Sequence, residues 1–220
     1  MQLTKLLALA AIVLCLGASG AFATLVAPNA MISGPGTNFT GLIGAELAGL
    51  PTIKYSGVAL KDTFGNTVGT GDLQVGVAAS DTAGFIDFLY QYKVITGDLG
   101  DLSVSNFTGF STDVGYATAL AGWDTSLTPL PTGVQRGGSG SNVDFLYGTT
   151  VMPGMETPIL VVKVNAITAA LTGNTAMQEG GNANRASYAP TPEPSKAGVL
   201  LGLLFAAGLF VARRFQVLQS

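Results

Sequence analysis

Short runs of alternating apolar and polar residues, separated by glycine-containing turns, constrain the fold of this chain more than any other sequence feature. Residues 73–77 alternate strictly, and residues 85–94 form a longer run that is rich in aromatic side chains. Alternation with a period of two is typical of β-strands that bury one face. The central part of the chain is therefore expected to form strands, and similar runs lie at residues 102–107, 114–121, 143–147 and 159–164.

Turn-forming residues stand between these runs and favour an all-β fold. Gly-Asp pairs occur at three places, and Pro153-Gly154 precedes the last run. Residues 43–50 and 166–171 are the segments that could form a helical turn or two, and residues 24–37 are expected to form an irregular N-terminal edge. Strands at this spacing, without a convincing amphipathic helix, predict a single antiparallel β-sandwich of an Ig-like or jelly-roll-like kind.

The N-terminal residues match a secretory signal peptide, which predicts export through the Sec translocon. Lys5 supplies the positive charge, residues 6–16 form the apolar stretch, and Ala21-Phe22-Ala23 is a small-x-small cleavage site formed by Ala21 and Ala23. The single cysteine lies within this segment, and the chain has no histidine. The mature exported domain is therefore expected to contain neither cysteine nor histidine, and to have no disulfide.

A second apolar segment lies near the C-terminus. Residues 197–212 form an uninterrupted run of small or apolar side chains, and Arg213 and Arg214 follow it. A helix of this length spans roughly 24 Å, somewhat less than the roughly 30 Å hydrocarbon core of a bilayer. The arginine pair is a basic stop that predicts an N-out, C-in orientation. The run is predicted to be a single transmembrane helix, either a permanent anchor or part of a removable sorting tail.

The motif Pro192-Glu193-Pro194 stands just before this apolar segment. Proline on both sides of Glu193 keeps the segment extended and unable to pair into a sheet. The order of motif, short helix and basic end resembles the PEP-CTERM sorting signal of Gram-negative bacteria. The resemblance implies that a membrane-embedded exosortase recognises the motif and cuts at or near it. It also implies an exported cell-envelope or extracellular-matrix protein associated with exopolysaccharide and biofilm.

Together these features divide the chain into four parts. They are a signal peptide (1–23), the exported β-sandwich domain (24–182), an extended linker that carries the Pro-Glu-Pro motif (183–195), and the transmembrane helix with its basic tail (196–220). Residues 24–190 contain six basic and twelve acidic side chains, a formal charge of −6. A domain with this acidic excess is a poor match for nucleic acid or for an anionic membrane surface.

The mature domain offers few groups for catalysis. Without histidine or cysteine it can form neither a Cys/His zinc site nor a Ser-His-Asp or cysteine triad. Glycoside hydrolysis, which uses two carboxyl groups about 5 to 9.5 Å apart, stays open. Most aspartates adjoin glycine, serine or threonine, where aspartate commonly closes a turn. The aspartate pairs closest in sequence are Asp81 with Asp87, Asp98 with Asp101, and Asp113 with Asp124.

Calcium binding is a further possibility for loop carboxylates in an exported domain. Asp98, Asp101 and Asp113 are the candidate ligands, although no EF-hand or nonapeptide repeat accompanies them. Trp123 is expected to pack at a sheet end rather than to stack on a sugar. The leading prediction is a non-enzymatic structural or adhesive protein without a catalytic, cofactor or metal site. The alternatives are a secreted carbohydrate-active enzyme using paired aspartates, and a carbohydrate- or calcium-binding adhesion module.

Overall fold

The computed structural model describes residues 25–125 and 129–192, and every regular element within them is a β-strand. No helix in these residues is long and apolar enough to cross a membrane. The predicted signal peptide and transmembrane segment lie outside the described residues. In chain order the strands are β1 (Met31–Ser33), β2 (Thr37–Asn38), β3 (Ile43–Glu46), β4 (Ile53–Lys61), β5 (Thr67–Ser80), β6 (Ile86–Thr96), β7 (Leu99–Val104), β8 (Thr112–Ala117), β9 (Gly133–Arg136), β10 (Val143–Val151), β11 (Ile159–Val164), β12 (Ala169–Gln178) and β13 (Asn182–Pro190).

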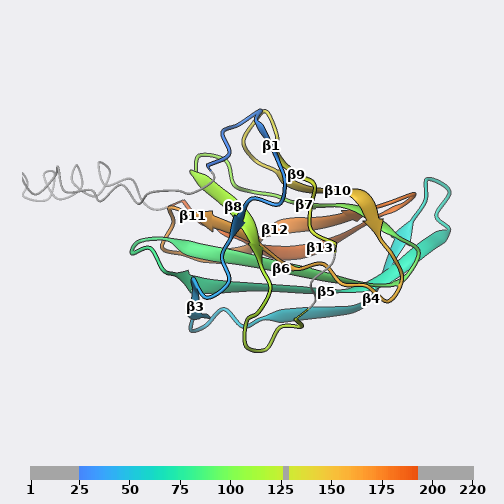
Figure 1. The fold of residues 1–220 in the computed structure, drawn as a ribbon, viewed down its shortest axis with the longest axis horizontal. Coiled ribbons are helices and arrows are strands. Elements are labelled where there is room, and N and C mark those ends of the chain that lie inside the picture. The colour runs from blue at the N-terminus through green and yellow to red at the C-terminus, as the bar shows by residue number, and fades with distance from the viewer. Residues whose placement is uncertain (1–24, 126–128, 193–220) are drawn as a thin grey trace, which may run out of the picture.

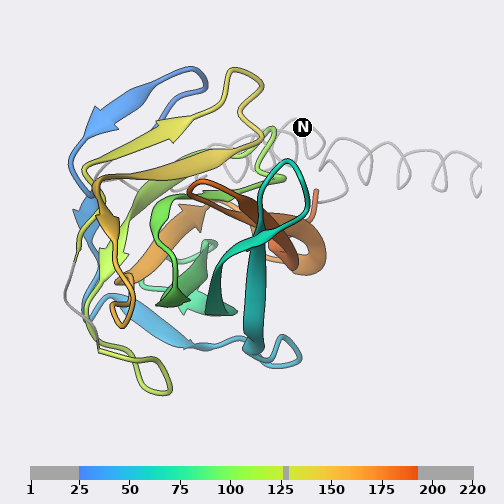
Figure 2. The same ribbon diagram turned by 90° about the vertical axis from the view of Figure 1, so that its right-hand side faces the viewer.

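All of these strands belong to one strongly curled sheet (Figure 1). Its order is β1-β9-β10-β7-β12-β13-β4-β5-β6-β11-β8-β2, and β3 pairs with β5 off this path. Neighbouring strands are antiparallel, except that β2 and β8 are parallel. Figure 2 looks along the long strands and shows how the sheet curls around its own interior. The prediction of an all-β domain is confirmed.

The pairing differs from the predicted two-sheet sandwich at the junction of β13 and β4. A single residue pair, Asn182 with Lys61, joins these strands and makes the two halves one sheet. The halves still face each other across a shared interior, where the Tyr90 hydroxyl on β6 donates a hydrogen bond to the Tyr188 carbonyl oxygen on β13 (3.2 Å). The domain is thus a single curled sheet rather than two separate layers. The sandwich prediction missed this because one residue pair leaves no pattern in the sequence.

Both edges of the sheet end in the same short stretch of chain. β1 pairs with β9 at one edge, β2 pairs with β8 at the other, and only residues 34–36 separate them. A side chain at Gly36 would collide with the backbone of Val114, so this close passage requires glycine. The segment expected to be an irregular N-terminal edge therefore closes both edges of the sheet.

Arg136 at the end of β9 fixes this N-terminal segment in place. Its guanidinium is buried and donates hydrogen bonds of 2.7 to 3.1 Å to four backbone carbonyl oxygens, those of Val26, Phe107, Phe110 and Gly140. A planar fork with five N–H donors can satisfy several carbonyl groups at once. Arg136 therefore joins three segments that are distant in sequence.

Alternation along β6 sends its side chains into two packing clusters. Phe88 and Tyr90 point into the interior cluster, which fills the curl with buried side chains from both halves of the sheet. Leu89 points the other way into a smaller outer cluster, which also contains Phe39, Ala78, Ala117, Trp123, Ile159 and Val161. Trp123 is buried and packs on Gly76 of β5, where an added Cβ would lie 2.9 Å from the indole Cζ2. Trp123 was expected to pack at a sheet end; it does pack on the sheet, but over Gly76, which lies inside β5 rather than at its end.

Three local predictions are wrong. Residues 182–190, of which 183–190 were expected to belong to the extended linker, form β13 and pair along β12. Most of their side chains are small or polar, so the sequence lacks the apolar alternation that predicts a strand, although Ser187, Tyr188 and Ala189 are buried. Residues 43–46 form β3, and residues 169–171 begin β12, in place of the expected helical turns. Pairing with neighbouring strands outweighs local preference at these positions.

Candidate functional site

A row of charged side chains crosses three neighbouring strands on the outer face of the sheet. Lys163 on β11 stands directly opposite Asp87 on β6 and directly opposite Asp113 on β8. Residues opposite each other in an antiparallel pair point to the same face, so the three side chains lie side by side. All three residues are buried. This row, together with Asp81, is called the Lys163 site below.

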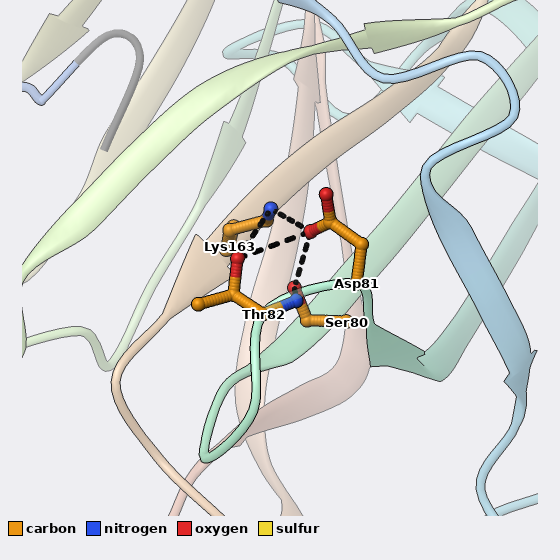
Figure 3. A network of polar contacts seen from close by, with 4 residues as sticks. All are labelled: Ser80, Asp81, Thr82 and Lys163. Carbon is orange, nitrogen blue, oxygen red and sulfur yellow. Dashed lines mark hydrogen bonds and ion pairs between the residues drawn. The ribbon is translucent and has the colours of Figure 1, made fainter. Parts of the chain in front are cut away.

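The Lys163 ammonium contacts Asp81, which follows the end of β5 (Figure 3). The Asp81 carboxylate also accepts hydrogen bonds from the hydroxyls of Ser80 and Thr82, both at 3.2 Å, and Nζ lies 3.5 Å from the Thr82 hydroxyl. The Phe39 ring covers the site, with its centroid 4.9 Å from Nζ. Asp81 itself is partly exposed, so the site lies just beneath the surface.

The two nearest carboxyl groups at this site have opposite pKa shifts. The hydrogen bond from Lys163 lowers the pKa of Asp81, which keeps that carboxylate ionised. Burial raises the pKa of Asp87 to about 7, and the charge of Lys163 and the nearby Ser80 hydroxyl offset this only in part. Neither carboxyl oxygen of Asp87 has a hydrogen-bond partner among the described residues. At neutral pH the site therefore combines an ionised carboxylate, Asp81, with a partly protonated carboxyl group, Asp87, near one lysine.

A second polar group of side chains lies at the other end of the outer cluster. Asp124 and Glu156 meet in a cavity of about 150 Å³ whose lining includes Lys54, Gln91 and Lys93. Burial, followed by the charge of Asp124, raises the pKa of Glu156 to about 7. A hydrogen bond between the two carboxyl groups also contributes to this shift, so the pair lacks the separation that glycoside hydrolysis uses.

Gln91 on β6 forms the inner end of this cavity. Its amide nitrogen donates hydrogen bonds to the carbonyl oxygens of Asp124 (2.9 Å) and Thr157 (3.2 Å). Its amide oxygen is buried and has no hydrogen-bond partner among the described residues. The cavity therefore presents a carboxyl pair and two lysine side chains to a small polar ligand.

The aspartates predicted as pairs are distributed differently from the expectation. Asp81, Asp87 and Asp113 come together at the Lys163 site, whereas Asp124 lies in the cavity with Glu156. Asp98 lies in the turn between β6 and β7. Asp101 lies on β7, where burial and then the charges of Asp144 and Glu179 raise its pKa to about 6.

The three proposed calcium ligands are not brought together. Asp113 is on β8 and Asp101 is on β7, and these strands belong to different halves of the sheet. Within residues 25–125 and 129–192, no group of three or more acidic side chains is placed to hold a metal ion. These three aspartates were predicted as calcium ligands because they were expected to lie in loops. Strand pairing instead places Asp101 and Asp113 on different halves of the sheet.

Lys163 was missed in the sequence, although a signal for its pairing with Asp87 exists. Lys163 is the single charge in the apolar run 159–164, and Asp87 is the single charge in the run 85–92. A lone charge inside a strand buried on both faces needs a partner on a neighbouring strand. The strand register that places Lys163 opposite Asp87 is set when the sheet folds and cannot be read from either run alone.

Of the sorting-motif residues, Pro192 lies in the described part of the chain. It is exposed and stands two residues beyond the end of β13. Glu193, Pro194, Arg213 and Arg214 lie outside the described residues, as do Ala21 and Ala23 at the predicted signal cleavage site. A comparison of the chain with protein-family models, with curated proteins and with solved structures finds no match in any of the three.

Proposed function

We propose that the chain is an exported protein of the cell envelope or extracellular matrix, with a structural or adhesive rather than an enzymatic role. The observation that carries the proposal is the place of the Pro-Glu-Pro motif. The sheet ends at Pro190, and exposed Pro192 opens the motif directly after it. A sorting enzyme requires a recognition sequence outside the folded sheet. The motif, the apolar run and the arginine pair follow in the order that a sorting signal needs.

The proposed route follows from these signals. The Sec translocon exports the chain, and its C-terminal helix holds it in the inner membrane with the N-terminus outside. An exosortase-type enzyme then acts at the motif, and the β domain passes to the cell surface or the extracellular matrix. There it associates with exopolysaccharide. The Lys163 site is buried beneath the Phe39 ring, and the cavity with Asp124 and Glu156 holds only about 150 Å³, which favours the structural role.

Intact mass of the extracellular protein tests the sorting proposal. The wild type is expected to lack residues 1–23 and the residues that follow the motif. A Glu193→Ala variant is expected to keep the C-terminal segment and to stay in the membrane fraction. Glu179→Ala removes the same charge from an exposed turn and is the matched control, which should be processed like the wild type. A wild-type protein that retains residues 195–220 would make the helix a permanent anchor and overturn the proposal.

The cavity that contains Asp124 and Glu156 supports a second candidate, a carbohydrate-binding adhesion module. Sugars are bound through several converging donors and acceptors, and this cavity brings the Asp124 and Glu156 carboxyl groups together with two lysine side chains. Co-sedimentation with purified exopolysaccharide tests this. If the cavity binds sugar, Glu156→Gln weakens binding and Glu179→Gln does not. Equal binding by both variants would remove this candidate.

A further inference from the structure

We propose that Lys163 and Asp81 form an intramolecular isopeptide bond, an amide between the lysine Nζ and the aspartate Cγ. The first observation is the contact itself, between a buried amine and the carboxyl group of a residue 82 positions away. The second is a fully buried carboxyl group, Asp87, directly opposite the lysine. The proposal concerns the folded domain and does not depend on how the chain is sorted.

Sheet geometry explains why these two groups meet. β6 lies between β5 and β11, so a side chain on β11 must cross β6 to reach the end of β5. Lys163 stands opposite Asp87 on β6, and its Nζ reaches Asp81 just after β5 ends at Ser80. Reacting groups held together by a rigid sheet behave as one molecule, which removes most of the entropic cost of joining them.

The surroundings of the lysine ease the proton transfer that must come before attack on Asp81. Lys163 is 6% exposed, and the Phe39 ring covers its Nζ at 4.9 Å. The resting pair is ionic, because the hydrogen bond from Lys163 lowers the pKa of Asp81. Partial removal of water lowers the cost of passing a proton from this ammonium to the carboxylate, which gives the amine that attack requires. Asp81 remains partly exposed, so the water released by the reaction has a route to solvent.

Asp87 supplies the acid and base that amide formation needs. Its carboxyl group is fully buried, has no hydrogen-bond partner among the described residues, and belongs to the residue directly opposite Lys163 in the β6–β11 pair. Burial raises its pKa to about 7, so it is partly protonated at neutral pH and can both give and accept a proton. A permanent structural partner of Lys163 would instead be ionised and hydrogen-bonded.

The reaction balances without any co-reactant. Lys163 first passes one proton to the Asp81 carboxylate, and the Nζ lone pair then attacks Cγ of Asp81. Asp87 donates its proton to the leaving hydroxyl oxygen and takes up a proton that Nζ releases. One C–N bond forms, one C–O bond breaks and one water molecule leaves, while Asp87 ends in its starting state. No oxidant or reductant is consumed.

Such a bond would give this domain a covalent cross-link although it has no cysteine from which to form a disulfide. The described residues contain no cysteine, so no disulfide can form among them. The amide would tie β11 to the turn between β5 and β6, and so connect the centre of the sheet to a surface loop. An amide also resists the reducing conditions that cleave disulfides.

Tryptic peptide mapping of the full-length protein tests the proposal. Trypsin cuts after Lys61, Lys93, Arg136 and Arg185, and it cannot cut after a lysine whose amine is acylated. The expected product is a branched species that joins residues 62–93 to residues 137–185 and is lighter than their sum by one water. Fragmentation is expected to place the link at Asp81. A separate peptide 137–163 with an unmodified peptide 62–93, or a link at Asp87 or Asp113, overturns the proposal.

Two variants separate the chemistry from folding. Lys163→Arg keeps a cation but cannot form this bond, and it is expected to give only unlinked peptides. Asp87→Asn keeps the shape of the acid and removes its proton chemistry, and it is expected to lower the linked fraction at least tenfold. Asp98→Asn, in the turn between β6 and β7 and outside the Lys163 site, is the control and should stay linked. Tryptophan fluorescence of buried Trp123 shows whether each variant folds. A folded Asp87→Asn protein that is fully linked overturns the role of Asp87.

Discussion

The two faces of β6 show how differently one strand can use its side chains. Phe88, Tyr90 and Tyr92 enter the interior cluster, where stabilisation comes from apolar packing between the halves of the sheet. On the opposite face, Asp87, Leu89 and Gln91 alternate with them. Leu89 sits in the small outer cluster, Asp87 belongs to the Lys163 site, and Gln91 forms the end of the Asp124 cavity.

The comparison indicates that the interior face holds the fold together and the outer face carries its chemistry. The outer apolar cluster is small, and polar groups bound it at both ends of the same strand. It keeps water away from Lys163 at one end and from Gln91 at the other. Substitutions on the interior face should therefore change stability at every pH, whereas those on the outer face should change how stability responds to pH.

The largest effect is expected from Phe88→Ala on the interior face. Phe88 is fully buried and packs edge-to-face on Phe107, with ring centroids 5.5 Å apart and an interplanar angle of 87°. Removing a buried phenylalanine ring costs about 3 to 5 kcal/mol of unfolding free energy. Urea unfolding followed by circular dichroism measures it. Phe64→Ala, at a hairpin tip where Phe64 is 88% exposed, is the control and should change stability by less than about 0.5 kcal/mol. Similar losses in the two variants would contradict the assignment of the interior core.

The second prediction concerns pH and the outer face. The pKa of Asp87 is about 7 in the folded protein and near 3.8 in an unfolded chain, so the folded state binds more protons between these values. Stability is therefore expected to increase as pH falls from 8 to 5, with about 3 kcal/mol attributable to this fully buried group. The groups that face Asp87 are Lys163, Asp81 and Asp113. Asp81 has a lowered pKa and titrates below this window.

Asp87→Asn should flatten this pH dependence without abolishing it. Glu156 and Asp101 also have raised pKa values, about 7 and about 6, and add slope of the same sign. Unfolding free energies from urea titrations at four pH values would measure the difference between the two proteins. An unchanged slope in Asp87→Asn would show that Asp87 is ionised throughout this range, contrary to the expectation.

The strands of the domain could be predicted from sequence far better than their partners. The run 159–164 coincides with β11, and 73–77 and 85–94 fall almost entirely within β5 and β6, because alternation is a local property. β12 and β13 escaped prediction, since small residues such as Ala and Asn do not produce a clear apolar pattern. The closure of both sheet edges by residues 31–38 depends on contacts with residues about 80 to 100 positions away, which no local pattern contains.

The candidate site shows the same limit. Asp81 and Asp87 were paired by their closeness in sequence, and they do lie at one site. Asp113 joins them rather than Asp124, because pairing of β8 with β11 sets its position. Register cannot be read from alternation alone, since every shift by two residues preserves the pattern. Lys163, Phe39 and Glu156 were missed for this reason.

Gly76→Ala is expected to have an intermediate effect and to be confined to the outer face. An added Cβ would lie 2.9 Å from Cζ2 of Trp123 and 3.0 Å from the Thr52 hydroxyl, so the indole must move. Overpacking of this kind costs about 1 to 3 kcal/mol. The change should appear both in unfolding free energy and as a shifted emission maximum of Trp123. Gly137→Ala, where the nearest atom would be 3.7 Å away, is the control and should alter neither quantity. An unshifted Trp123 spectrum in Gly76→Ala would contradict the close packing.

The smallest effect, and the closest comparison of the two faces, comes from making the same substitution on each. Phe107→Leu removes an interior ring that packs on Phe88, while Phe39→Leu removes the outer ring above Lys163. Both phenylalanines are almost completely buried, so their exposure does not distinguish them. The interior variant loses an aromatic pair as well as volume and should lose about 2 kcal/mol, against about 1 kcal/mol for the outer one. Phe39→Leu alone should also admit water to the Lys163 site and reduce the linked tryptic fraction. If both variants lose the same unfolding free energy and the linked fraction is unchanged in Phe39→Leu, the ring above Lys163 contributes packing alone. The outer face would then be a second hydrophobic core, contrary to the comparison.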